Sequence, residues 1–593
     1  MPHAPCPMPH APYPILMQAK NIQDIYTLSP TQQGILFHIL SAPNSGIYLE
    51  QTLCTLHGNL NVSIFEQSWQ QVVDRHPSLR TGFIWENLDK PVQVVHRQVK
   101  LLIQHYDWRG RSIPEQEAQL QAYLEADQRH GFELSEPPLM RLALIRISED
   151  TYQFIWSAYH LVLDAWCLNI LLQEFFSIYK ALSQGQSVDL KPSRPYRDYI
   201  AWLKQQNISE AEIFWRQVLQ GFRLPTPVPM DGSSDSLPSL EASYGQEHIL
   251  VSLATTVALK SLAKQHHLTV NTLLLAAWAL LLSDYSGQED VLFGTVVSGR
   301  PATLHGVESM VGLFINTLPM RVQISSTALV LPWLKELQSQ QTKLRQYEHT
   351  PLAQVQSWSD VPRGLPLFES IFVFQNSVVD TSDLSTGFKI DRVCSFANSN
   401  YPIAFVVVPG SQLKLEVRYD LRRFQPVTVI RILRHMEAII NSLVAEPDVQ
   451  LGSLMDVVDK LERKAHAQEF VGELSDAQTH LVKNFVPPHT STEKVIANIW
   501  AKVLQLEKVG IHDNFFDIGG NSLLTIPICS KIRETLNVNI SVIDLLTYPT
   551  VSEFAKYLAQ NQETEQAVFS DNSRASRKKE AIKTQKQRRS RNA

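Results

Sequence analysis

Apolar residues recur along the chain with two alternating periods, about 3.6 residues and two residues, from about residue 22 to residue 443. This alternation predicts one large α/β body in which helices pack on layered sheets. Residues 63–66, SIFE, have the composition of a capping box, and the apolar positions after them have helical spacing, so we expect a helix to begin there. The longest strongly apolar run, residues 270–282, is too short to cross a bilayer and predicts a buried helix.

A histidine and an aspartate stand four residues apart inside the apolar stretch YHLVLDAW, residues 159–166. The apolar positions before it alternate, and those after it have helical spacing; the two sets are Phe154, Trp156 and Ala158, and Leu168, Leu171, Leu172, Phe175, Phe176 and Tyr179. We therefore expect His160 on the same strand face as the first set, at the strand end, and Asp164 in a turn or at a helix start. There the imidazole can enter a cleft while the carboxylate holds the loop, provided that a cation satisfies it.

The ordinary alternative is that His160 is a hydrogen-bonded core residue. The pair at residues 266–267, which lacks an aspartate at the same spacing, is an internal comparison and is predicted to begin a helix.

The composition changes after about Gly452. We interpret residues 456–488 as a linker and residues 489–562 as a second, smaller unit. This unit begins with a capping box from Thr490 to Glu493 and an amphipathic helix. Residues 1–20 are predicted to be a disordered leader, and residues 563–593, which are basic and nearly devoid of apolar side chains, a disordered tail.

Charge and cysteine content narrow the functional classes. With 44% hydrophobic and 19% charged residues and a net charge of −5, the chain has the composition of an ordinary soluble enzyme and no bias toward nucleic acid or membranes. Its five cysteines are widely separated, so we expect a reducing, cytoplasmic compartment and no metal site. The basic tail leaves a nucleic-acid function as a minor alternative, because no aromatic residues are interleaved to stack on bases.

A glycine pair and a serine stand in the stretch DNFFDIGGNSL, residues 513–523, between two helical patterns. Two glycines let the backbone approach a ligand closely. A serine at the start of a helix would hold an anionic group at the helix N-terminus, where free backbone N–H groups stabilise it. The alternative is that Ser522 is only a helix cap. The stretch, with YPTV at residues 548–551, resembles the attachment site of peptidyl carrier proteins, which implies a small four-helix bundle and a covalent 4′-phosphopantetheine on Ser522. Pro527 departs from the family pattern, since it would kink the helix that Ser522 is expected to begin.

The stretch at 159–166 resembles the HHxxxDG motif of the condensation domains of nonribosomal peptide synthetases, which belong to the chloramphenicol acetyltransferase-like superfamily. Further motifs of that family follow in order at residues 28–38 (LSPTQQGILFH), 75–83 (RHPSLRTGF), 196–199 (YRDY), 311–319 (VGLFINTLP) and 347–352 (YEHTPL). The resemblance covers roughly residues 22–455. It implies an α/β fold of two such lobes, residues 21–188 and 189–455, in a V-shaped pseudo-dimer.

The resemblance implies the roles of individual residues. His160 corresponds to the catalytic histidine, and Asp164 to an architectural aspartate, which we expect to pair with Arg80. Tyr159 replaces the first histidine of the motif, and Ala165 replaces its glycine. Asn316, in the motif at 311–319, is expected to support the site.

The implied function is an amide-forming acyl transfer from a carrier-bound acyl or peptidyl thioester to an amine, the acceptor being an aminoacyl thioester on the chain's own carrier unit. Because the two units occupy residues 22–560, no adenylation domain is expected in this sequence. The expected partners are therefore a phosphopantetheinyl transferase, a separate adenylation enzyme and an upstream carrier protein that delivers the donor. The alternatives are a condensation-like platform that recruits tailoring enzymes to the carrier, and an epimerisation or cyclisation relative.

Overall fold

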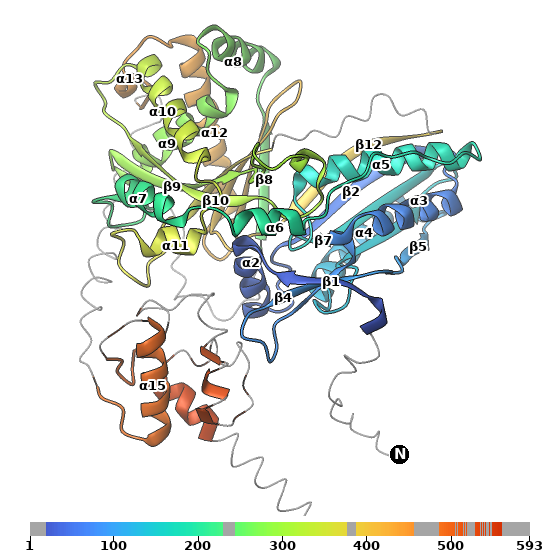
Figure 1. Ribbon diagram of the computed structural model, residues 1–593. Helices are drawn as coiled ribbons and strands as arrows, with labels where there is room; N and C mark the ends of the chain where they lie inside the picture. The colour runs from blue at the N-terminus through green and yellow to red at the C-terminus, as the bar shows by residue number, and fades with distance from the viewer. Residues whose placement is uncertain are drawn as a thin grey trace, which may run out of the picture. The chain divides into compact units, whose positions relative to one another are not determined.

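Figure 1 shows the computed structural model of the chain. The residues that the structure describes are 19–228, 244–375, 387–455, 486–504, 506, 508–513, 515, 518, 528–529, 531–533, 535–536, 538, 540, 545, 548 and 550–559. They belong to two compact units: residues 19–85, 91–361 and 366–455 lie in the larger, and those from 486 onward lie in the smaller. Within the larger unit we call residues 19–183 the first half and residues 197–455 the second half.

The first half is built on a five-stranded sheet with the order β12-β2-β7-β6-β5. Its strands are β2 (Leu49–Gly58), β5 (Ile103–Asp107), β6 (Met140–Arg146), β7 (Thr151–Tyr159) and β12 (Phe388–Ala397). The β5–β6 pair is parallel, and the other neighbours are antiparallel. Helices of this half are α3 (Val62–Arg75), α4 (Ile113–His130) and α5 (Ala165–Ser183).

One face of β7 carries the main core of the first half. Phe154, Trp156 and Ala158 are buried on this face, and Ile155 and Ser157 are buried on the other, so the strand is covered on both sides. The ring of Trp69, on α3, lies 5.1 Å from that of Trp156 and stacks at 4.8 Å on Phe175 of α5. Aromatic side chains therefore join the sheet to both helices and fix the strand end that precedes His160.

A smaller sheet with the order β1-β4-β3 completes the first half. Its elements are η1 (Ala19–Asn21), β1 (Ile22–Thr27), α2 (Pro30–Ser41), η2 (Pro77–Arg80), β3 (Thr81–Ile84) and β4 (Val92–His96). Ser29 caps α2 in a capping box with Gln32. The Gln32 side-chain amide also donates to the Leu161 carbonyl at 2.8 Å, so that α2 holds the loop after His160.

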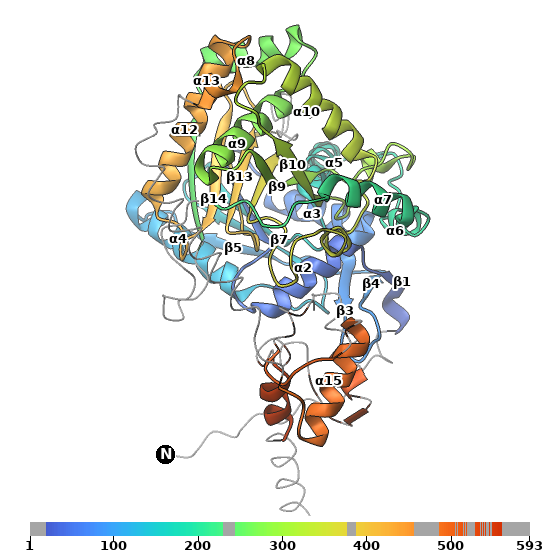
Figure 2. The same cartoon turned by 90° about the vertical axis from the view of Figure 1, so that its left-hand side faces the viewer.

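The second half is built on a six-stranded sheet with the order β10-β9-β11-β13-β14-β8. Its strands are β8 (Tyr244–Leu250), β9 (Asp290–Val297), β10 (Asn316–Gln323), β11 (Ser370–Phe374), β13 (Ile403–Val408) and β14 (Lys414–Asp420). Its helices are α6 (Arg197–Leu203), α7 (Ile208–Leu219), α8 (Leu253–Gln265), α9 (Val270–Ser286), η3 (Val307–Ser309), α10 (Val330–Arg345), α11 (Leu352–Ser357), α12 (Pro426–Ala445) and α13 (Leu451–Met455). In Figure 2, α9, α10 and α12 lie over one face of this sheet.

The apolar run at 270–282 forms the buried helix that its composition predicts, since every residue of α9 from 272 to 283 is buried. Among the described residues, no single helix is long and apolar enough to cross a bilayer; α8 and α9 reach that composition only when taken together, and they meet at 109°.

Two local predictions were wrong. The helix expected from residues 63–66 is present, but Ser63 does not cap it, because the helix begins at Val62 and the Asn61 side chain accepts from the Ile64 N–H. His266 does not begin a helix but caps the C-terminus of α8, and His267 follows with φ of 56°, in the left-handed region that ends helices.

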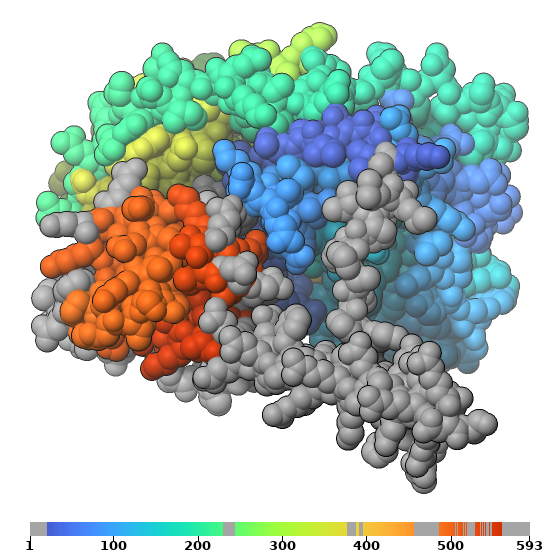
Figure 3. All heavy atoms as spheres, turned by 60° about the horizontal axis from the view of Figure 1, so that its bottom comes forward, coloured from blue at the N-terminus to red at the C-terminus, as the bar shows by residue number. Residues whose placement is uncertain are grey.

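Strand β12 crosses between the two halves. It belongs to the second half by sequence, inside the expected lobe 189–455, yet it pairs with β2 at the edge of the first-half sheet. Figure 1 shows it beside β2. The segment from α5 to α7 forms a second connection, and it appears in Figure 3 as a green band that runs from the blue residues to the yellow ones.

The smaller unit contains α15 (Ser491–Leu504) and shorter helical stretches packed around a common core. The predicted capping box is confirmed, since Thr490 Oγ1 accepts from the Glu493 N–H at 3.1 Å and Glu493 accepts from the Thr490 N–H at 2.9 Å. Fully buried Trp500 meets Phe515 edge to face at 5.1 Å. The helix thus packs against the chain that enters the glycine-serine motif.

Candidate active site

His160 lies directly after β7, where the period-two pattern ends. Its backbone N–H donates to the Tyr48 carbonyl at 2.9 Å, which holds it to β2. The imidazole Nδ1 lies 3.3 Å from the Leu163 carbonyl, and Nε2 lies 3.5 Å from Glu50 Oε2. Both ring nitrogens therefore face acceptor oxygens, and in the tautomer that is protonated at Nδ1 the ring donates to the Leu163 carbonyl while Nε2 keeps a lone pair. The side chain is 16% exposed, so part of it contacts solvent.

Asp164 caps α5, the helix that begins immediately after the histidine loop. Its Oδ1 accepts from the Cys167 N–H at 3.2 Å, and its Oδ2 accepts from the Phe314 N–H at 3.0 Å. The Arg300 guanidinium donates to Oδ1 at 3.2 Å. The carboxylate is fully buried, and these bonds compensate its desolvation. The prediction that Asp164 stands at a helix start beside a cation is therefore confirmed.

The cation that pairs with Asp164 is Arg300 and not Arg80, which corrects the prediction from the sequence. Arg80, at the end of η2, donates to the Val73 carbonyl at 3.2 Å, to the Arg97 carbonyl at 3.0 Å and to Gln23 Oε1 at 2.9 Å. Its donors are thus directed toward α3 and the segment after β4. Arg80 stabilises the first half from that position.

Arg300 follows β9 in the second half and uses its planar fork on several acceptors. Besides Asp164, it donates to the Val307 and Met310 carbonyls at 2.6 and 2.9 Å. Its guanidinium lies 4.0 Å from the ring centroid of Phe314. The preceding Gly299 has φ of 60°, and a Cβ there would lie 1.7 Å from the Phe314 carbonyl oxygen, so only glycine fits. The sequence signal for this residue was its place after a strand and a glycine.

The segment 311–314 is where most of the family-like motifs meet. Its consecutive backbone groups bond to four side chains from three parts of the chain: Val311 O to Ser78, Gly312 O to Cys167, Leu313 O to Tyr196 and Phe314 N to Asp164. The motifs at 75–83, 159–166 and 196–199 therefore converge on the motif at 311–319. A Cβ at Gly312 would overlap the Tyr196 ring at 2.2 Å, which explains the glycine.

Asn316 is the first residue of β10, and its side chain bonds to the segment at 347–352 rather than to the imidazole. Its side-chain amide donates to the Glu348 carbonyl at 2.9 Å and to the Thr350 carbonyl at 2.7 Å. These bonds attach the motif at 347–352 to the strand.

Tyr159 and Ala165, the two departures from the motif, both occupy structural positions. The Tyr159 ring lies edge to face with Phe132 at 5.4 Å, and its hydroxyl bonds to the Phe132 backbone. Burial raises the pKa of Tyr159, so the phenol stays neutral. Ala165 is the first residue of α5, where alanine suits helical geometry and no positive φ is required.

Glu50, on β2, is a second site residue, after Arg300, that sequence reasoning missed. Its side chain is 14% exposed and approaches the Nε2 atom of His160. A glutamate inside the β2 pattern Leu49–Gly58 was a signal, but the register with β7 is needed to place it beside the histidine.

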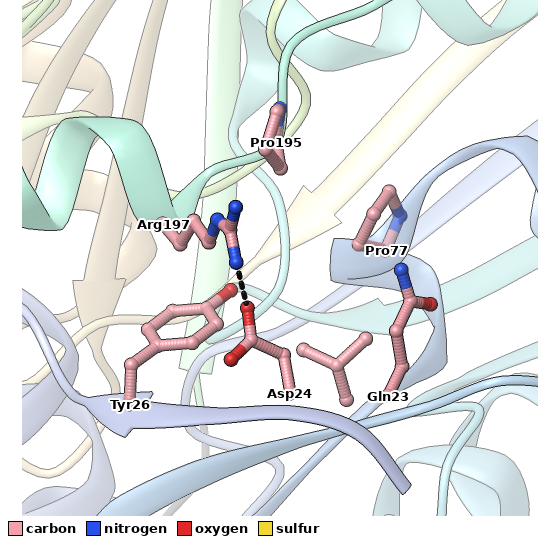
Figure 4. Close-up of a pocket in the computed structure, with 7 residues that line it drawn as sticks. Gln23, Asp24, Tyr26, Pro77, Pro195 and Arg197 are labelled. Atoms are coloured by element: carbon pink, nitrogen blue, oxygen red, sulfur yellow. Dashed lines mark hydrogen bonds and ion pairs between the residues drawn. The ribbon is translucent and has the colours of Figure 1, made fainter. Parts of the chain in front are cut away.

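A small cavity of about 170 Å³ lies elsewhere, lined by Gln23, Asp24, Tyr26, Pro77, Val95, Pro195 and Arg197. Figure 4 shows that Arg197 reaches Asp24 across it, at 2.9 Å, beside the Tyr26 hydroxyl. None of its lining residues is a predicted site residue.

The described residues contain no group of three or more His, Cys, Asp or Glu side chains that could hold a metal ion. Ser522, Pro527 and the glycine pair lie outside the described residues. The residues that lead into the motif suit an attachment site, because Asp513 accepts from the Gly510 N–H at 2.6 Å and Phe515 is fully buried, which fixes the chain before the serine.

Comparisons with known proteins agree with this geometry. The family model of the condensation domain matches residues 22–465, and that of the phosphopantetheine attachment site matches residues 494–558. One of the linear gramicidin synthase subunits from Brevibacillus parabrevis is 44% identical over 443 residues, which are 74% of this chain and 8% of that protein. Surfactin synthase subunit 3 from Bacillus subtilis strain 168 is 35% identical over 75% of this chain and 35% of its own length.

Solved structures show the same fold at lower identity. The starter condensation domain of rhizomide synthetase matches with a TM-score of 0.63 and 20% identity, over 74% of this chain and 99% of that one. The X-domain from teicoplanin biosynthesis matches with a TM-score of 0.61 and 18% identity, over 72% and 96% of the two chains.

The chain spans only 6 to 9% of the length of the three gramicidin synthase subunits that it matches. The second family match indicates a covalently attached 4′-phosphopantetheine. The chain belongs to the condensation-domain family of nonribosomal peptide synthetases and carries a phosphopantetheine attachment domain.

Proposed function

We propose that the larger unit forms an amide bond between a carrier-bound acyl or peptidyl thioester and the amine of an acceptor, with His160 as the catalytic residue. The observation that supports this most is a partly exposed imidazole whose Nδ1 faces the Leu163 carbonyl, so that in the tautomer protonated at Nδ1 the Nε2 atom can accept a proton. Around it, Asp164 and Arg300 are buried and fixed, so they frame the site without entering the chemistry.

Positioning contributes more to this reaction than proton removal does. An α-amino group with a pKa of about 7.7–8.0 costs only about 1 kcal/mol to deprotonate near neutral pH. Holding two reactants in line can contribute about 7–11 kcal/mol. His160 orients the amine and accepts its proton as the C–N bond forms and the C–S bond breaks, a contribution of about 10²–10⁴-fold.

We further propose that Ser522 is the attachment residue and that residues 489–562 are a four-helix carrier domain, joined by the linker 456–488 to two chloramphenicol acetyltransferase-like lobes, 21–188 and 189–455, in a V-shaped pseudo-dimer. When bound, phosphopantetheine supplies a thiol that holds the cargo as a thioester. The carrier bears the acceptor and is loaded in trans by a separate adenylation enzyme, after a phosphopantetheinyl transferase has modified it. The donor arrives on an upstream carrier protein, in the cytoplasm.

Intact-protein mass spectrometry and an amide-forming assay test the two parts. Wild type treated with a phosphopantetheinyl transferase should gain the mass of the prosthetic group, and Ser522→Ala should not. His160→Ala should lose about 10²–10⁴-fold in the rate of amide formation with loaded carriers. The control is His105→Ala, which removes a histidine that is paired with Glu66 on the surface. If His160→Ala matched wild type, the catalytic assignment would be refuted, and a platform that recruits tailoring enzymes would be favoured.

A further inference from the structure

Glu50 is a carboxylate at the reacting end of the imidazole that the histidine mechanism leaves unused. Its Oε2 lies 3.5 Å from His160 Nε2, the nitrogen that is to meet the acceptor amine. In the described part of the chain, no other side chain forms an ion pair or a hydrogen bond with this carboxylate. Glu174 differs in this respect, because Arg75 lies 3.0 Å from it.

The strand register leaves room beside Glu50. It is paired directly with Ala158 on β7 and with Ala397 on β12, so the side chains directly opposite it on both neighbouring strands are methyl groups. The Glu50 and His160 side chains are 14% and 16% exposed. A small polar group can therefore reach both side chains.

The separation suits a third partner. At 3.5 Å the carboxylate and Nε2 are farther apart than in an ordinary charge-assisted hydrogen bond, so with the ring proton on Nδ1 each keeps acceptor capacity. A primary ammonium group carries three N–H donors and a positive charge. It can donate one N–H to Glu50 and another to Nε2, while its third N–H stays free.

We propose that Glu50 binds the ammonium group of the acceptor and places its nitrogen against His160 Nε2. This inference rests on the proposed function. The bound ammonium gives one proton to Nε2, which passes it to water, and its freed electron pair attacks the donor thioester carbonyl. As the C–N bond forms and the C–S bond breaks, the second proton moves through Nε2 to the leaving thiolate, giving an amide and a thiol.

The proposal predicts which acceptors Glu50 favours. A carboxylate attracts a cationic amine and gives no such advantage to a neutral hydroxyl. Glu50 would therefore select 2-amino acyl acceptors over 2-hydroxy acyl acceptors of the same shape. A purely structural role would affect both acceptors equally.

The test compares two soluble acceptors, an aminoacyl thioester of N-acetylcysteamine and the matching 2-hydroxyacyl thioester, with a loaded donor carrier and the full-length holo-protein. Glu50→Gln should raise the apparent KM for the amine acceptor about ten- to a hundredfold, because one charge-assisted hydrogen bond is lost. The KM for the donor and the rate with the hydroxyl acceptor should stay near wild type. Glu50→Asp should restore part of the amine preference.

The matched control is Glu66→Gln, which removes a carboxylate 2.6 Å from an exposed histidine, His105. It should leave both acceptors unchanged. Thermal unfolding of each variant verifies that Glu50→Gln is folded. Equal loss with both acceptors, or an unchanged KM for the amine, would refute the role of Glu50 alone. A wild-type protein that forms no amide with the amine acceptor would refute the proposed function itself.

Discussion

Two carboxylates near the histidine loop are held in opposite ways. Asp164 is fully buried and accepts from Arg300 and from two backbone N–H groups at 3.0–3.2 Å. Glu50 is partly exposed and stands 3.5 Å from His160. Both oxygens of the first accept hydrogen bonds within the fold, whereas the second keeps free acceptor capacity toward solvent.

The difference separates architecture from chemistry. A buried ion pair that joins two halves of a chain fixes their geometry, and it cannot take part in proton transfer without uncovering a charge. A loosely held pair that solvent reaches can exchange its partner for a ligand. Asp164, in the motif, therefore stabilises the fold around the histidine, and Glu50, outside the motif, is the carboxylate that faces the reactants.

The largest expected effect comes from breaking the buried pair. Asp164→Ala should lower the free energy of unfolding by about 3–5 kcal/mol, because Arg300 is left buried without its partner. Glu50→Gln, at the accessible pair, should change it by less than about 1 kcal/mol. Urea unfolding of both variants measures the contrast. Similar losses for the two variants would contradict the division into a structural pair, Asp164 with Arg300, and a reactive pair, Glu50 with His160.

A pH titration extends the comparison to a histidine that the fold keeps neutral. Burial lowers the pKa of His38, on α2, to about 4. As the pH falls, the unfolded chain therefore binds a proton at this histidine before the folded chain does. The free energy of unfolding is unaffected above about pH 6.5 and decreases as the pH falls toward 4, by up to about 3 kcal/mol. Unfolding of wild type and His38→Gln, followed between pH 7 and 4, measures it. The variant should show a flatter profile in this window, and parallel profiles would contradict the assignment.

The smallest expected effect concerns the tyrosine that replaces the first motif histidine. Tyr159→Phe removes a hydroxyl that bonds to the Phe132 backbone and should cost about 1 kcal/mol of stability. Amide formation should stay at the wild-type rate, since the ring packs against Phe132 and not beside Nε2. Chemical denaturation and the same product assay measure the two quantities. A large loss in the rate of amide formation would instead assign Tyr159 a role in the reaction.

Local periodicity predicted the parts of this site that depend on neighbouring residues. The change from period two to helical spacing placed His160 at a strand end and Asp164 at a helix start, and the structure confirms both positions. The buried helix α9 and the Thr490 capping box were predicted for the same reason. Helix starts were harder to place, because Asn61, Ser63 and other small polar residues compete for one capping position.

The partners that come from far along the chain were not predictable in this way. Arg300 is 136 positions from Asp164, and nothing in the periodicity of either segment connects them. Arg80 was preferred because it stands in a family-like motif, yet backbone carbonyls of its own region use its donors. Glu50 required the β2–β7 register. The attachment of a prosthetic group to Ser522 stays a prediction.

The crossing strand β12 has a practical meaning for anyone who wishes to recombine this enzyme with others. If the protein were cut between α5 and α6, β2 would lose β12, its neighbour on one side. The exposed edge of β2 would then promote aggregation. Gene fusions and subdomain exchanges should therefore carry β12 from the same parent as β2, although more than three hundred codons separate the two.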